Sequence, residues 1–188
     1  MLLEREDVNP DQPDTQYDRT PLSLAAKSGH DRIVKMLLER EDVDPDQPDT
    51  KYGQTPLSLA AKNGHDGIVE MLLEREDVNP DQPDAEYCWT PLEWASVHGH
   101  DGIVKMFLER EGVNPDHADI NHGWTPLKWA PDSGHDGIVT LPVERNDVCT
   151  AMPDHMNQTS QLLALPEPHY GVARNPPERD TVNCTQTG

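Results

Sequence analysis

The chain is short of the residues from which a single globular core is built. Its 188 residues include one phenylalanine, four tryptophans and 34% hydrophobic residues, against 18 prolines. A domain of this length normally buries one contiguous apolar core, and this composition supplies little material for one. We therefore expect the apolar surface to be buried by another kind of architecture.

Basic residues are also scarce. Fifteen Lys and Arg face 35 Asp and Glu, which gives a net charge of −20. The electrostatic field of such a negative charge repels phosphate backbones and anionic lipids and attracts basic proteins. Nucleic acid and membrane partners are therefore not expected. No apolar run approaches 18 residues, and the start "MLLEREDV" lacks the basic residues and apolar length of a signal peptide. These absences predict a cytoplasmic protein, with the nucleus left open.

The three cysteines, Cys88, Cys149 and Cys184, do not form a recognisable framework. They make no CxxC motif and no Cys/His spacing suited to zinc, and an odd number argues against a set of disulfides. We expect thiols rather than disulfides at all three positions.

What the sequence does contain is a repeat. The segment "TPLSLAAKSGHDRIVKMLLE" begins at Thr20, and close copies begin at Thr55, Thr90 and Thr125. The period is therefore 35 residues throughout. A fixed period of this size indicates a stacked array, in which each unit buries its apolar face against its neighbours.

Each unit carries its own signals for where helices begin and end. Thr20 followed by Pro21 is typical of an N-cap and first helical residue, and Gly29 is typical of a left-handed helix end. A second helix is indicated by apolar residues on one broad face, namely Ile33, Val34, Leu37 and Leu38. The unit is predicted to be helix, turn, helix and extended loop.

The segment "TPLSLAAKNGHDGIVEMLLE" resembles the ankyrin repeat, although the usual His after TPL is replaced by Ser23, Ser58, Glu93 and Lys128. The "LLEREDVNPDQPD" style is similar to ankyrin arrays of filamentous fungi, which often follow a NACHT-type nucleotide-binding domain in receptor-like proteins. The resemblance implies an all-α ankyrin-repeat solenoid. It also implies protein binding through loop tips and the concave helix face, without catalysis.

The repeat divides the chain into units. Residues 1–14 match only a second helix and loop, and residues 151–188 keep no period and are predicted to be a flexible tail rich in Pro and Thr. In the fourth unit Pro131 and Pro142 stand where helical residues are expected, which predicts a frayed or bent unit. The expected repeats are residues 15–49, 50–84, 85–119 and, in degenerate form, 120–150.

The acidic motif "VNPDQPD" at Val8–Asp14 returns in each loop and raises the question of calcium. The loop from Asp42 imitates an EF-hand at its first positions. However, Gln47 stands where the turn needs glycine, and Gly53 stands where a bidentate Glu should close the coordination shell. We expect a solvated turn that joins units, with a possible role as an acidic docking edge.

His-Asp pairs occur once in each unit, beginning at His30, His65, His100 and His135. A catalytic site is needed once, so four copies favour a structural role, and the resemblance implies a bond to backbone between units. No motif for a nucleophile elbow, zinc protease or phosphate loop occurs. No enzyme activity, cofactor, metal site or small-molecule substrate is predicted.

The residues that differ between units point to binding. Tyr and Trp are enriched at binding hot spots, and several of them precede a TPL motif. The tyrosines have an equally supported alternative as a loop-against-loop ladder, while Trp94 and Trp129 are predicted to pack in the core. The predicted partner-binding residues are Tyr87, Trp89, Val97, His98, His122 and Trp124.

The combined prediction is a protein-binding module whose partner presents a basic surface. The alternative is a truncated or degenerate fragment of a larger receptor-like protein, without independent function. Cooperative thermal unfolding of the isolated chain favours the module, and broad unfolding with oligomerisation favours the fragment.

Overall fold

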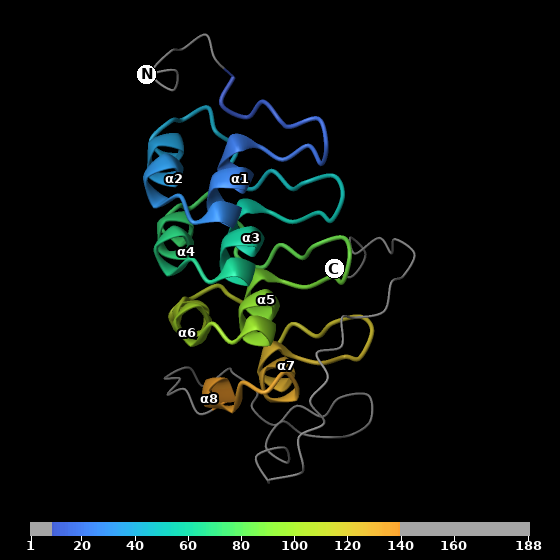
Figure 1. Cartoon of the computed structure of the whole chain (residues 1–188). Coiled ribbons are helices and arrows are strands. Elements are labelled where there is room, and N and C mark those ends of the chain that lie inside the picture. Colours follow the sequence, from blue (N-terminus) through green and yellow to red (C-terminus); the bar gives the residue numbers. More distant parts are fainter. Residues whose placement is uncertain (1–8, 140–188) are drawn as a thin grey trace.

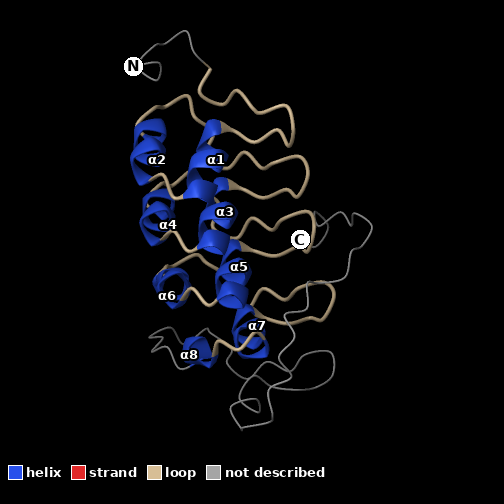
Figure 2. Ribbon diagram, viewed as in Figure 1, coloured by secondary structure: helices blue, strands red, loops and turns tan. Residues whose placement is uncertain are grey.

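The computed structural model describes residues 9–139 as a stack of helix pairs, with loops that project to one side (Figures 1 and 2). No strand occurs in this part of the chain, so the predicted all-α solenoid is confirmed. The helices are α1 (Pro21–Ser28), α2 (Asp31–Leu38), α3 (Pro56–Asn63), α4 (Asp66–Leu73), α5 (Pro91–His98), α6 (Asp101–Glu109), α7 (Pro126–Asp132) and α8 (Asp136–Val139).

The predicted helix signals are confirmed in the first three units. The Thr20 hydroxyl accepts the Ser23 N–H at 3.1 Å, and Thr55 caps α3 in the same way. Gly29 ends α1 with a φ of 71°, in the left-handed region that favours glycine. Each first helix therefore stops after two turns, and the chain turns back into the second helix.

The helices form two columns, and the core lies between them (Figure 1). Helices α1, α3, α5 and α7 contact one another in sequence, and the second helices pack beside them. The four apolar positions of the second helix are all buried in α4 and α6. In α2 Val34 and Leu37 are buried, but Ile33 is 43% exposed, so the predicted face is only partly covered there.

Helix α7 continues through Pro131 to Asp132, so this proline does not interrupt the described helix. It lies near the C-terminal end of α7, where a ring that blocks one hydrogen bond disturbs few residues. Pro142, the tail at residues 151–188, and all but residues 9–14 of the first partial repeat lie outside the described residues.

Candidate partner-binding surface

Four loops project from the stack, and each closes on itself. They are loop 1 (9–20), loop 2 (39–55), loop 3 (74–90) and loop 4 (110–125). In loop 3 the Asp84 N–H donates to the Trp89 carbonyl at 3.0 Å, and the Asp84 carboxylate accepts the Tyr87 N–H at 2.7 Å. The other loops repeat both bonds from Asp14, Asp49 and Asp119.

Aspartates also tie each loop to the next. The Asp46 carboxylate accepts the Asn79 N–H at 2.5 Å, and Asp81 accepts the Asn114 N–H at 2.9 Å. Asp11 does the same for loop 2. Asp11, Asp46 and Asp81 are therefore hydrogen-bond acceptors that join one loop to the next, and not merely the solvated charges that were expected.

Burial affects the carboxyl groups of this row. Desolvation raises the pKa of Asp46, and the Asn79 N–H bond partly opposes that change. Desolvation also raises the pKa of Asp84, which is fully buried and bonded to loop N–H groups. Within residues 9–139 no group of three or more His, Cys, Asp or Glu side chains could hold a metal ion.

Backbone bonds link the tips of the first three loops. The Thr50 N–H donates to the Tyr17 carbonyl at 3.0 Å, and the Ala85 N–H donates to the Tyr52 carbonyl at 2.8 Å. Among the described residues no equivalent bond joins Tyr87 to Ile120. The tip of loop 4 therefore lacks one tie that the preceding tips have.

The repeated histidines join neighbouring units. The His65 imidazole donates to the Lys27 carbonyl at 3.1 Å, and its ring lies against Gly29 so closely that a Cβ there would come within 2.7 Å. His100 makes the same bond to Lys62. The predicted structural role is confirmed for these two histidines.

An aromatic cluster fills the space between loops 3 and 4 and helices α5 and α7. Ring centroids lie 4.8 Å apart for Trp89 and Trp94, and 5.0 Å apart for Trp89 and Trp129. The indole N–H of Trp94 donates to Asp84 at 2.7 Å. The cluster consists of Tyr87, Trp89, Trp94, His122, Trp124 and Trp129.

The cluster changes the interpretation of two tryptophans. Trp89 is only 3% exposed, so the expectation that it stands out at a loop tip is wrong. Rings from the next unit cover it, and this packing depends on which residues the neighbour supplies. Trp94 is buried as predicted, while Trp129 is half-buried.

The other predicted binding residues keep some exposure. Tyr87, His122, Trp124 and Val97 are half-buried, and His98 is exposed on the inner helix α5. Tyr87, His122 and Trp124 belong to the aromatic cluster and the His98 ring packs against Trp94, but the role of these residues in partner binding stays a prediction. Although the residue as a whole is exposed, its ring packs against Trp94, and this partial desolvation lowers the pKa of His98; the nearby Lys62 ammonium acts in the same direction.

A buried pair that the sequence reasoning missed connects α5 to loop 4. Glu93 is 0% exposed, accepts the Thr90 N–H at 2.7 Å, and accepts from the His117 imidazole at 3.1 Å. Burial raises the pKa of Glu93 to about 6, and the hydrogen bond to Glu93 raises the pKa of His117. The sequence does carry a signal for this pair, because both residues differ from their counterparts in the preceding unit, which are Ser58 and Gln82.

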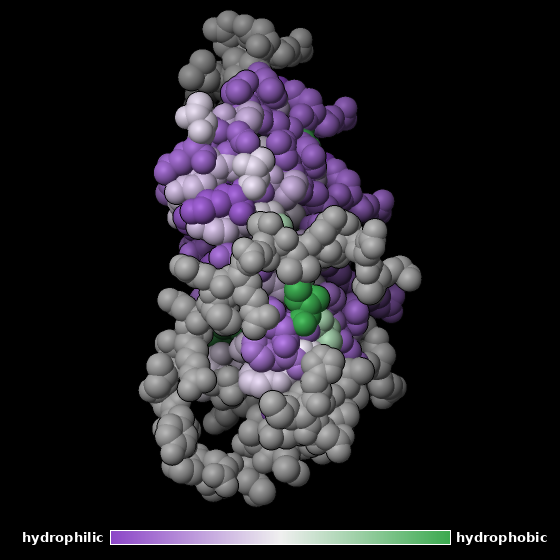
Figure 3. All heavy atoms as spheres, turned by 90° about the vertical axis from the view of Figure 1, so that its right-hand side faces the viewer, coloured by the Kyte–Doolittle hydropathy of each residue, from purple (hydrophilic) through white to green (hydrophobic). Residues whose placement is uncertain are grey.

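Ile120 is the second residue that the sequence reasoning missed. It is 51% exposed at the tip of loop 4, where the preceding loops have Thr50 and Ala85. Figure 3 shows the loop side of the molecule, where much of the described surface is hydrophilic. A large apolar side chain in a hydrophilic surface is a candidate contact.

The tips of loops 1 and 2 are different, because the chain's own cations cover their rings. The Lys51 ammonium lies 4.9 Å from the centre of the Tyr17 ring and 4.5 Å from that of the Tyr52 ring. The Arg19 guanidinium lies 4.6 Å from the Tyr17 centroid. Such placements are attractive because the ring face carries negative charge.

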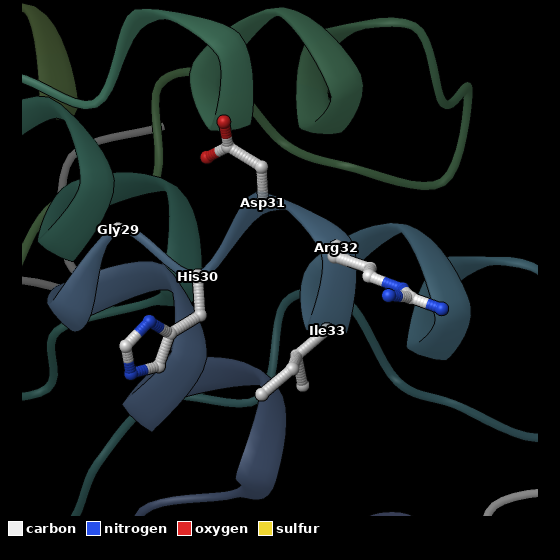
Figure 4. Close-up of a pocket in the computed structure, with 5 residues that line it drawn as sticks. All are labelled: Gly29, His30, Asp31, Arg32 and Ile33. Atoms are coloured by element: carbon white, nitrogen blue, oxygen red, sulfur yellow. The ribbon is translucent and has the colours of Figure 1, made fainter.

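A surface depression of about 320 Å³ lies at the turn between α1 and α2. Figure 4 shows that the side chains of His30, Asp31, Arg32 and Ile33 point in different directions and do not converge. Binding sites for small molecules bring a few polar groups together in an enclosed pocket. This depression is therefore not a candidate site.

Two further observations bear on the sequence predictions. Cys88 is buried in loop 3 at 3% exposure, and the other two cysteines, Cys149 and Cys184, lie outside the described residues. No helix within residues 9–139 has the length and apolar character needed to cross a membrane.

Comparison with known families agrees with the repeat. Residues 1–84 match the family model described as "Ankyrin repeats (3 copies)", and residues 87–120 match the one described as "Ankyrin repeat". No curated protein matches the chain.

Proposed function

The chain belongs to the ankyrin repeat family, and from that premise we propose that it is a non-catalytic module that binds a partner protein. Ankyrin repeats are generally protein–protein interaction modules. The proposed contacts are the loop tips and the concave face formed by α1, α3, α5 and α7. The sequence differences between units make the third and fourth units the preferred region.

The row of tied loops is the observation that supports this proposal most. Neighbouring loops are joined by carboxylate bonds such as Asp46 to Asn79 at 2.5 Å and Asp81 to Asn114 at 2.9 Å. A surface that is already ordered loses less conformational entropy when a partner binds. Residues at the tips are therefore presented at fixed positions, while their side chains vary from unit to unit.

The proposed partner has a basic surface. The net charge of −20 speeds the encounter with a cationic protein and slows the encounter with an anionic one. We expect the association rate to fall as salt rises, because screening shortens the reach of the field. Affinity depends instead on a few contacts that exclude water.

The test is affinity capture with the full chain as bait. A second bait carries Ile120→Thr and Trp124→Ala, and a third carries Lys105→Ala on the outer helix α6, where Lys105 is exposed. We expect a protein that the first and third baits retain and the second releases. The proposal fails if no protein is retained specifically, or if the outer-helix variant loses binding while the loop variant keeps it.

A further inference from the structure

Loops 1 and 2 show how a cation sits on the loop row. Lys51 extends over the rings of Tyr17 and Tyr52, at 4.9 Å and 4.5 Å from their centres. Two repeats further along, the residues that correspond to this trio are Tyr87, Asn121 and His122. The ring positions are kept between loops 3 and 4, but the lysine is replaced by a neutral side chain.

The residue that precedes Tyr87 adds a negative charge. Glu86 is exposed at the tip of loop 3 and directly precedes Tyr87. In loop 2 the same position is occupied by Lys51 itself. The position that precedes the tyrosine therefore carries a cation in loop 2 (Lys51) and a carboxylate in loop 3 (Glu86).

The tip of the following loop carries an apolar side chain. Ile120 is 51% exposed and directly precedes Asn121, whereas the residue before Lys51 is Thr50. Groups suited to a cation, an aromatic contact and an apolar contact are therefore found on the tips of two successive loops, loop 3 and loop 4. We name Glu86, Tyr87, Ile120, Asn121 and His122 the tip surface.

We propose that the tip surface receives a Lys or Arg side chain of the partner, with a neighbouring apolar side chain of the partner on Ile120. This inference rests on the proposed function and narrows it to a basic-apolar segment of a protein. The cation occupies the place on Tyr87 that corresponds to Lys51 on Tyr17. Glu86 supplies the opposite charge, as a rim carboxylate does at other interfaces.

The test uses three synthetic peptides as probes for the full chain labelled with ¹⁵N. The first is acetyl-Gly-Leu-Lys-Gly-Leu-Lys-Gly-amide; in the second each Leu is replaced by Ser, and in the third each Lys is replaced by Glu. Backbone and indole N–H shifts are followed during titration. We expect saturable shifts at Tyr87, Ile120 and Asn121 with the first peptide, and binding at least about five-fold weaker with the second and third.

Two variants with the same change of charge make the test specific. Asn121→Lys places the chain's own cation where Lys51 stands in loop 2, and Gln16→Lys places one at the tip of loop 1, three units away from Asn121. We expect Asn121→Lys to weaken the binding of the first peptide at least about five-fold, and Gln16→Lys to change the affinity for that peptide less than about two-fold. Circular dichroism checks that both variants fold.

The outcomes separate this inference from the proposed function. Shifts that centre on another part of the array, equal effects of the two variants, or no saturable binding of any peptide would each overturn the tip surface as a cation site. None of these results affects capture of a partner by the whole array. Failure of the capture experiment is what would remove the proposed function.

Discussion

Replacing the buried pair of Glu93 and His117 offers the sharpest test of how the third unit is held to loop 4. The variants are Glu93→Ser, His117→Gln and the combination of both. Ser and Gln are the residues at the equivalent positions Ser58 and Gln82, so the double variant restores the chemistry of the preceding unit. Each single variant leaves one member of the pair without its partner.

The contacts in the structure give the expected loss of unfolding free energy for each single variant. Breaking a buried ion pair by removing one partner costs about 3–5 kcal/mol. The His117 side chain is 28% exposed, and Glu93 keeps two bonds to Thr90, so we expect His117→Gln to cost about 2 kcal/mol. Glu93→Ser gives up the capping box but also removes a buried charge, and should cost about 1 kcal/mol or less.

The double variant should be close to wild type, because no buried charge is left unpaired. The coupling free energy in the double-mutant cycle is then about 2–3 kcal/mol. The free energies of unfolding are measured by urea denaturation at pH 7. The reasoning is refuted if His117→Gln costs less than about 0.5 kcal/mol, or if the double variant loses the sum of the two single losses.

The pair also predicts a dependence on pH. The folded-state pKa of Glu93 is about 6 against an ordinary 4.5, so its contribution to stability is present below 4.5 and is lost as pH rises through 6. The difference of 1.5 corresponds to about 2 kcal/mol. The raised pKa of His117 acts with the same sign, because its contribution is present below 6.5 and lost above its folded-state value.

Unfolding free energies at several values between pH 4.5 and 7.5 therefore complete the experiment. We expect the wild type to lose stability relative to the double variant as pH rises across this window. Other carboxyl groups titrate in both proteins, and the comparison removes their effect. Parallel curves for the two proteins would show that the pair does not titrate as the structure indicates.

Three further predictions concern stability and are checked by denaturation. Gly64→Ala should cost at least about 1 kcal/mol more than Gly112→Ala, because both have positive φ but only the first would clash with a histidine ring. Trp94→Phe keeps an aromatic ring but removes an indole bond of 2.7 Å to a buried aspartate, and should cost about 1–2 kcal/mol. Asp18→Gly should stabilise by about 0.5–1 kcal/mol, because Asp18 has a φ of 52° and the equivalent residue in loop 2 is glycine. An unchanged midpoint in any one of them would contradict the contact or strain it addresses.

The sequence predicted the helices because their signals are local. The cap at Thr20, the proline at Pro21 and the left-handed Gly29 act within one or two turns, and the structure confirms all three. The repeat period then sets which helix stacks on which. The overall architecture therefore needs no information beyond the unit and its copies.

The site was predicted less well, because exposure depends on neighbours. Trp89 occupies a loop-tip position in sequence, and only the packing of Trp129 from the next unit makes it buried. From the sequence the loop aspartates were expected to be solvated charges. The N–H group that donates to such an aspartate lies 33 residues away, as for Asp46 and Asn79, so the sequence alone does not indicate the bond. A buried Glu93 was not expected, since its partner His117 lies 24 residues further along the chain, in loop 4.

The central claim is that a partner protein contacts the loop tips and the concave helix face. Hydrogen exchange of the full chain with and without a captured partner tests it most directly. The account predicts slower exchange at the tips of loops 3 and 4 and along α5, with no change in the outer helices α4 and α6. Protection confined to α4 and α6, with the loop tips unchanged, would contradict it.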